Sequence, residues 1–370
     1  MAEPLKNSFG PDVPAAIAES IDRVFRDFDR PSFIAQCLDG FDELELTPRA
    51  RHISGALADH LPADRDRAIR ILIESLGPEI QAAELTGMDA FRYLPHVFFV
   101  ADHGVDHFET AMLAQYELTK RFTAEFSIRA YLRDYQQATL ARLRAWADDP
   151  NVHVRRLVSE GTRPRLPWAP RLTDFQIDPR PVIELLELLK DDPEEYVRRS
   201  VANNLNDIAK DHPDLVVGIA QRWSQGADRN RMRLLRHGLR TLVKQAHPGA
   251  LEVLGFGPES PVQVSEVRVT PDRVGIGDRV GIEIELVNPE EGAHGALVDL
   301  VVHFVKANGS TSAKVFKGAE RILEAYERTT VNKTISLKQH STRTHYPGRH
   351  RVEVQLNGAV VPGGEFELCE

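Results

Sequence analysis

A 14-residue motif occurs twice in this sequence, with a constant offset of 43 residues between the copies. The first copy spans residues 148–161 and the second spans residues 191–204. A period of about 40–47 residues is typical of HEAT-like repeats, in which each unit is a pair of helices. Both copies begin with Asp-Asp-Pro, and we expect each proline to lie in the first helical turn, where its fixed φ is favourable. Such repeats stack into an α-solenoid with an extended binding surface.

The charged residues of the motif lie on a different helix face from its apolar residues. Valine and leucine recur at helical spacing and form the buried stripe. The arginines on another face are Arg155, Arg156, Arg198 and Arg199. Glu160 lies one turn beyond Arg156, and Asp207 lies one turn beyond Asn203, the counterpart of Glu160. We therefore expect Glu160 and Asp207 to line neighbouring positions of one groove that suits a polyanion. Pairing of arginines with carboxylates across adjacent repeats is the alternative.

The hydrophobic pattern changes after residue 257. Upstream, amphipathic helical segments follow one another with short polar connections, and Thr47 is a candidate N-cap before Pro48. Downstream, apolar and polar residues alternate, most clearly over residues 280–286, and turn signals such as Asn357-Gly358 separate the runs. About seven short strands indicate an immunoglobulin-like sandwich. The sequence thus predicts a multidomain protein, with an all-α HEAT-like solenoid over residues 1–257 and an all-β immunoglobulin-like sandwich over residues 258–370.

The distribution of charge matters more than the net charge of −9. Residues 1–118 contain 10 Lys and Arg against 21 Asp and Glu, whereas residues 119–171 contain 11 against 5. Local charge decides where a phosphate backbone docks, so the central segment is compatible with nucleic acid. The two cysteines lie near opposite ends, which fits a reducing cytoplasm. No apolar run is long enough to cross a bilayer, and we expect no membrane partner.

Three acidic residues lie in this arginine-rich context: Glu125, Glu160 and Asp207. The stretch SEGTRPRLPW, residues 159–168, continues from Glu160 into a basic loop that carries Arg163 and Arg165 and ends at Trp168. A tryptophan there can pack against a sugar or a base, with ordinary core packing as the alternative. A metal site is not expected, since His103 and His107 are four residues apart but lack a nearby third ligand.

The chain resembles the AlkC branch of the DNA-alkylation-repair glycosylases, which are relatives of AlkD built on HEAT-like repeats. The segments that carry the resemblance are residues 99–104, 122–132, 154–168, 200–208 and 235–240. The resemblance covers nearly all of residues 1–257, and its most specific part is the 159–168 motif. Some members of this branch also have a C-terminal immunoglobulin-like domain, which residues 258–370 match in kind.

The resemblance implies a monofunctional glycosylase that hydrolyses the N-glycosidic bond of 3-methyladenine and 3-methylcytosine in duplex DNA, without base flipping and without a cofactor. Glu125, Glu160 and Asp207 are the implied catalytic residues, and Trp168 would contact the lesion. The implied DNA-binding residues are Arg155, Arg156, Arg163, Arg165, Arg198, Arg199 and Arg236. The expected partner is double-stranded DNA with alkylated bases, bound by a cytoplasmic monomer that associates with the nucleoid.

The chemistry suits these residues. Alkylation at N3 makes the base cationic and a good leaving group, so the enzyme needs negative charge near the developing oxocarbenium sugar rather than a strong acid. An aromatic ring adds attraction for the cation. The alternative function is a non-enzymatic HEAT-repeat scaffold or a protein that binds DNA structures, because HEAT repeats are often binding platforms.

Basic residues in the β region lead to a further hypothesis, namely that this domain clamps DNA rather than a protein. They are Lys306, Lys314, Lys317, Arg321, Arg328, Lys333, Lys338, Arg343, Arg349 and Arg351. Residues 340–350 contain no acidic residue and are rich in His, Arg, Ser and Thr, which suits sugar and phosphate contacts. A solvated loop on a stabilising domain is the alternative.

Overall fold

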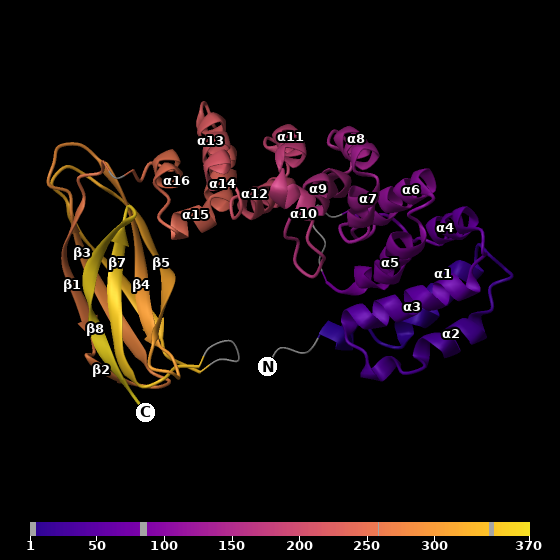
Figure 1. Cartoon of the computed structure of the whole chain (residues 1–370), viewed down its shortest axis with the longest axis horizontal. Coiled ribbons are helices and arrows are strands. Elements are labelled where there is room, and N and C mark those ends of the chain that lie inside the picture. Colours follow the sequence, from indigo (N-terminus) through magenta and orange to yellow (C-terminus); the bar gives the residue numbers. More distant parts are fainter. Residues whose placement is uncertain (1–4, 82–86, 258, 340–343) are drawn as a thin grey trace. The chain divides into compact units, whose positions relative to one another are not determined.

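The computed structural model describes residues 5–81, 87–257, 259–339 and 344–370 (Figure 1). Arg343 and its neighbours 340–342, which belong to the DNA-clamp hypothesis, lie outside the described residues. The chain forms two compact units, residues 1–211 and residues 212–370. In the described ranges, no helix is both long and apolar enough to span a bilayer.

The first unit is helical. Its α-helices are α1 (Asp12–Asp22), α2 (Arg30–Leu38), α3 (Leu46–His60), α4 (Arg65–Glu74), α5 (Leu94–His103), α6 (Phe108–Thr119), α7 (Ile128–Asp134), α8 (Gln136–Trp146), α9 (Val152–Gly161), α10 (Thr173–Ile177), α11 (Arg180–Leu189) and α12 (Glu195–Ile208). Short 3₁₀ helices are η1 (Leu5–Ser8), η2 (Phe41–Glu43) and η3 (Asp89–Tyr93). Helices pack in pairs, with α1 on α2, α7 on α8, and α9 on both α11 and α12.

The two copies of the sequence motif form α9 and α12, and their apolar stripes are buried as the spacing predicts. Val154 and Leu157 in α9, and Val201 and Leu205 in α12, are fully buried. The helix starts differ from the prediction. Asn151 caps α9, because its side chain accepts hydrogen bonds from the amides of residues 153 and 154. The proline of each copy therefore precedes the cap and lies outside the first turn.

The expected Thr47 cap is also wrong. Helix α3 begins at Leu46 with Glu45 at the N-cap position, so Thr47 and Pro48 both lie inside the first turn. Proline is tolerated there because the first four amides of a helix have no intrahelical partner.

The second unit begins with helices α13 (Pro213–Ser224), α14 (Arg229–Gly238), α15 (Arg240–Lys244) and α16 (Pro248–Val253). The strands follow, so the fold class changes between Val253 and Gln263 as predicted. The compact units divide earlier, between Asp211 and His212, and the last four helices group with the strands. That residues 1–257 act as one glycosylase domain stays a prediction.

The strands form the predicted sandwich. They are β1 (Gln263–Thr270), β2 (Arg273–Gly275), β3 (Arg279–Val287), β4 (His294–Val305), β5 (Thr311–Leu323), β6 (Arg328–Ser336), β7 (Gly348–Leu356) and β8 (Ala359–Cys369). One sheet has the order β1-β3-β6, and the other has the order β2-β8-β7-β4-β5 (Figure 1). The inward residues of both sheets make the core, for example Ile284, Leu300 and Val354. Asn357 and Gly358 have positive φ and form the two-residue turn of the β7–β8 hairpin, as the Asn-Gly pair predicts.

Candidate active site

A hollow of about 400 Å³ lies in the first unit, between η3, α5, the 122–126 segment, α9 and the loop that follows α9. Much of its wall is aromatic or aliphatic, with Phe91, Phe98 and Phe122 among the lining residues. Its charged and polar lining residues are Thr47, Thr123, Glu125, Arg156, Glu160, Arg163 and Tyr196, and Trp168 also borders it. We call it the groove. Five of the site residues predicted from the sequence line it: Glu125, Arg156, Glu160, Arg163 and Trp168.

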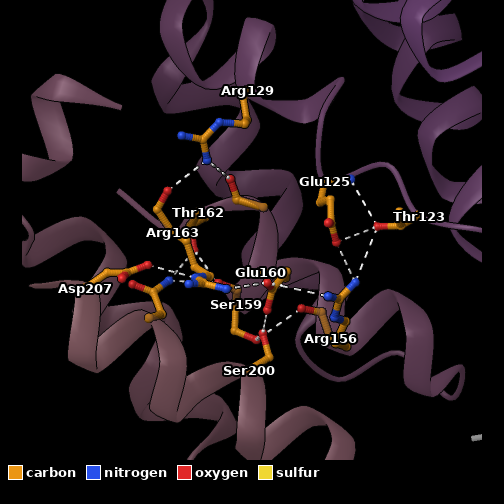
Figure 2. A network of polar contacts seen from close by, with 12 residues as sticks. Thr123, Glu125, Arg129, Arg156, Ser159, Glu160, Thr162, Arg163, Ser200 and Asp207 are labelled. Carbon is orange, nitrogen blue, oxygen red and sulfur yellow. Dashed lines mark hydrogen bonds and ion pairs between the residues drawn. The ribbon is translucent and has the colours of Figure 1, made fainter. Parts of the chain in front are cut away.

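Glu160 lies near the end of α9, where its side chain is enclosed by polar partners (Figure 2). Oε1 accepts a hydrogen bond of 2.7 Å from Arg163 Nη1 and lies 3.5 Å from Arg156 Nη2. Oε2 accepts a hydrogen bond of 2.6 Å from the Ser200 hydroxyl. Burial favours the neutral acid, but Arg156, Arg163 and the hydrogen bonds outweigh it and hold the pKa of Glu160 below its ordinary value. Glu160 is therefore a carboxylate at neutral pH.

Arg156 also binds Glu125, through its other terminal nitrogen. Glu125 Oε2 accepts hydrogen bonds from Arg156 Nη1 at 2.6 Å and from the Thr123 hydroxyl at 3.0 Å. The Arg156 guanidinium also lies over the Tyr196 ring, 5.3 Å from its centroid. Burial opposes the charged form of Arg156, yet Glu125 and Glu160 raise the pKa of Arg156 above its ordinary value. Arg156 thus joins the two glutamates.

Asp207 stands behind Arg163 and does not line the groove. Its side chain is 2% exposed, and its Oδ2 accepts a hydrogen bond of 2.8 Å from Arg163 Nε. Its Oδ1 pairs with Lys210 Nζ at 3.0 Å. The expectation that Glu160 and Asp207 line the groove side by side is therefore wrong for Asp207, because Arg163 lies between the two carboxylates. The alternative from sequence, pairing across adjacent repeats, accounts for the Arg163–Asp207 contact.

Together these residues form a chain of alternating charge: Glu125, Arg156, Glu160, Arg163 and Asp207 (Figure 2). Each arginine contacts two carboxylates, so every buried charge in the chain has a partner of opposite sign. This network of five side chains fixes negative charge at the groove and restricts the movement of each side chain.

Trp168 is exposed rather than packed in the core. Its residue exposure is 72%, and its backbone φ is +63°. The ring therefore offers a free aromatic surface at the border of the groove, and the core-packing alternative does not hold.

The other arginines that the sequence predicts to bind DNA differ in their exposure and in the groups that they bond. Arg155 binds the Asp192 carboxylate at 2.6 and 3.1 Å, and Arg198 binds the carbonyls of Asp192 and Pro193. Both therefore hold the Asp-Asp-Pro segment of the second copy. Arg165 pairs with Asp211, Arg236 pairs with Glu320, and Arg199 is exposed near the Tyr196 ring. Contact of any of them with DNA stays a prediction.

Sequence reasoning missed two residues that shape the site. Ser200 donates a hydrogen bond to Glu160. Alignment of the two copies could have identified it, because this polar residue aligns with the buried Leu157 of the first copy. Arg129 in α7 is 5% exposed and donates to backbone carbonyls of the loop after α9. Burial lowers the pKa of Arg129 to about 10, so it remains charged at neutral pH. An arginine in an amphipathic helix usually indicates a surface position, so nothing local marked it.

No group of three or more His, Cys, Asp and Glu side chains that could hold a metal is present within the described ranges. His103 ends α5, and His107 precedes α6 and contacts Asp66 through Nδ1 at 2.7 Å. The two histidines thus flank the α5–α6 connection rather than share a helix face.

Comparison with known proteins agrees with this geometry. Residues 118–233 match a family model described as DNA alkylation repair enzyme, and residues 263–370 match the C-terminal Ig-like domain of the uncharacterised protein YhaZ. The chain is 32% identical over 366 residues to the uncharacterised protein YhaZ of Bacillus subtilis (strain 168), covering 99% of both chains. It is also similar to the structure of Pseudomonas fluorescens alkylpurine DNA glycosylase AlkC bound to DNA containing an abasic site analogue, with a TM-score of 0.90, 35% identity and full coverage of both chains. The chain therefore belongs to the AlkC-type family of DNA-alkylation-repair glycosylases with a C-terminal immunoglobulin-like domain.

Proposed function

We propose that this protein excises N3-alkylated bases, 3-methyladenine and 3-methylcytosine, from duplex DNA as a first step of base excision repair. The observation that carries the proposal is the pair of arginine-bound glutamates, Glu125 and Glu160, held at a groove beside an exposed tryptophan. The protein is proposed to act as a cytoplasmic monomer, associated with the nucleoid when it binds DNA.

The charge state of Glu160 favours this class of substrate. A carboxylate whose pKa lies below its ordinary value cannot protonate a leaving base at neutral pH. N3-alkylated bases do not need that proton, since they already carry a positive charge. As the N-glycosidic bond breaks, its electron pair moves to the base and neutralises it, while positive charge develops on the sugar. The fixed carboxylates stabilise that charge.

Hydrolysis then needs one water molecule. Its oxygen forms a bond to C1′ of the sugar, and its proton passes to a carboxylate or to solvent, which leaves an abasic site and a neutral free base. Glu125 and Glu160 both border the groove, so both are proposed to hold the sugar charge and the water. Asp207, behind Arg163, is proposed to act by keeping Arg163 and Glu160 in place.

Excision without base flipping is supported by the position of Trp168. Its exposed ring can stack on a nucleotide at the surface of the protein, so the base need not enter an enclosed cavity. Arg165, Arg199 and Arg236 are the proposed phosphate contacts, because their side chains are more exposed than those of Arg155 and Arg198. We further propose that basic residues of the sandwich grip DNA.

Release of free base tests the proposal. Purified protein is incubated with methylated duplex DNA, and 3-methyladenine and 3-methylcytosine are measured by chromatography. The matched control is Glu184→Gln, which removes an exposed carboxylate that pairs with Arg144. We expect wild type and the control to release base alike. Tight DNA binding without any base release would instead support the non-enzymatic scaffold.

A further inference from the structure

Arg129 makes an unusual set of contacts for a buried charge. Its Nη1 donates to the carbonyls of Gly161 at 3.2 Å and Arg163 at 2.8 Å, while Nε and Nη2 donate to the Pro170 carbonyl at 3.0 and 2.5 Å. All of its hydrogen bonds in the described part of the chain thus go to backbone carbonyls. Figure 2 shows the guanidinium above the start of this segment. Burial of an arginine without a bonded carboxylate is energetically costly, so we expect this buried side chain to serve a function.

The three carbonyls belong to one segment, residues 161–170, which we call the tryptophan loop. Gly161 directly follows Glu160 at the end of α9, and Pro170 lies two residues beyond Trp168. One side chain on α7 therefore ties the start of the loop to its end.

Trp168 needs such an anchor. A left-handed backbone conformation, here with φ of +63°, is unfavourable for a residue with a Cβ atom. Its own ring cannot compensate by packing, because Trp168 is 72% exposed. Strained backbone persists only where the surroundings determine it. Those surroundings include the Leu172 amide bonded to the Pro164 carbonyl at 3.1 Å, the buried Leu166 and the Arg129 bonds at Pro170.

We infer that Arg129 is a positioning residue for base excision, which fixes the tryptophan loop so that Trp168 stands against the lesion nucleotide beside Glu160. The inference rests on the proposed function for its effect on catalysis, but not for the anchoring itself. A lysine at 129 keeps the positive charge but has all its donors on one nitrogen, so it cannot hold the three carbonyls in the same geometry as the planar fork of arginine.

A double-mutant cycle separates positioning of Trp168 from general damage. Single-turnover excision is measured at saturating enzyme for wild type, Arg129→Lys, Trp168→Ala and the double variant. We expect Arg129→Lys to slow wild-type excision by about tenfold, because misplacement by about 1 Å can cost up to about 100-fold. In the Trp168→Ala background the same change should cost less than about twofold, since coupled residues are not additive. Equal losses in both backgrounds, or no loss in either, would overturn the inference.

A spectroscopic measurement tests the anchor without DNA. The chain has three tryptophans, and replacing Trp146 and Trp223 by Phe leaves Trp168 as the only emitter. Arg129→Lys in this background should lower the fluorescence anisotropy of Trp168, because the loop gains motion on the nanosecond timescale. Unchanged anisotropy in a folded variant would overturn the anchoring role, whatever the enzyme does. If wild type releases no base, the proposed function fails, while this result still decides the anchor.

Arg49 provides the matched control. It is 7% exposed and also binds backbone carbonyls, those of Lys6, Phe9 and Leu44. Arg49→Lys should lower thermal stability but leave the Trp168 anisotropy and the saturated excision rate near wild type. If Arg49→Lys reproduces both effects of Arg129→Lys, the inference fails. Should Arg129→Lys not fold, Arg129→Gln replaces it in the same cycle, because it places no charge in the buried site.

Discussion

Replacement of Glu160 by glutamine tests whether the ionised carboxylate drives excision. The change keeps size and shape but removes the negative charge between Arg156 and Arg163. A carboxylate about 5 Å from a unit positive charge, at an effective dielectric constant of about 20, contributes about 3 kcal/mol. Loss of one preorganised group at a site where charge develops costs a similar amount, about 2.7–4 kcal/mol. We therefore expect excision to slow by about 200-fold.

The protein should remain folded, because each arginine keeps another carboxylate. Arg156 still pairs with Glu125, and Arg163 still pairs with Asp207. Ser200 can still donate to the amide oxygen. The expected loss of stability is about 1–3 kcal/mol, the cost of a lost buried hydrogen bond rather than of an unpaired charge.

The assay is single-turnover release of 3-methyladenine at saturating enzyme, together with a binding isotherm on duplex DNA containing an abasic site analogue. The control is Glu184→Gln, which lies in an exposed ion pair. Binding should not weaken, since the variant loses a charge that repels phosphate. An excision rate within about threefold of wild type would remove Glu160 from the mechanism.

Four other predictions follow from the same structure. DNA binding should weaken by at least about tenfold between 50 and 200 mM salt, because each neutralised phosphate releases counterions; an isotherm that does not move would contradict a basic binding surface. Because the folded protein holds the pKa of Glu160 below its ordinary value of 4.5, the stability that Glu160 contributes is present above that value and is lost only as the pH falls through the lower folded pKa. The excision rate should accordingly stay level from about pH 8 to about pH 5, and a rate that climbs on acidification would indicate a protonated acid. Lys338→Glu combined with Arg349→Glu should raise the half-saturating enzyme concentration by about tenfold without changing the saturated rate, whereas Arg268→Glu in β1 should leave both values unchanged. Point substitutions are the better test of the sandwich, since removal of residues 258–370 would cut through a compact unit. Gly161→Ala should destabilise the protein by about 1–3 kcal/mol, measured by urea unfolding, because a Cβ there would lie 2.6 Å from Ile128 Cγ2 and push α7 from α9; unchanged stability would mean that the two helices separate easily.

Much of the fold follows from local sequence pattern. The 43-residue offset predicted the α9 and α12 pair, and the alternation after residue 257 predicted a sandwich. Strand β5 shows no regular alternation of buried and exposed residues, because it is an edge strand whose side chains are mostly partly or fully exposed. The start of α9 was misplaced because the difference between a cap and a first turn depends there on the hydrogen bonds that the Asn151 side chain accepts from the amides of residues 153 and 154. The N-cap residues of α3 and α12 accept no such bond.

The sequence by itself determined which elements form and which acidic residues stand out, because helical and strand periodicity record which face of an element is buried. Only the tertiary structure decided how those residues are used. Arg163 meets Asp207 across 44 residues, Arg156 meets Glu125 across 31, and Arg129 meets Pro170 across 41. No local pattern specifies these partners, since they depend on how the helices stack. For the same reason, the sequence wrongly predicted that Asp207 lines the groove and gave no indication of Arg129. In the structure Asp207 is buried behind Arg163, and Arg129 is buried against the tryptophan loop.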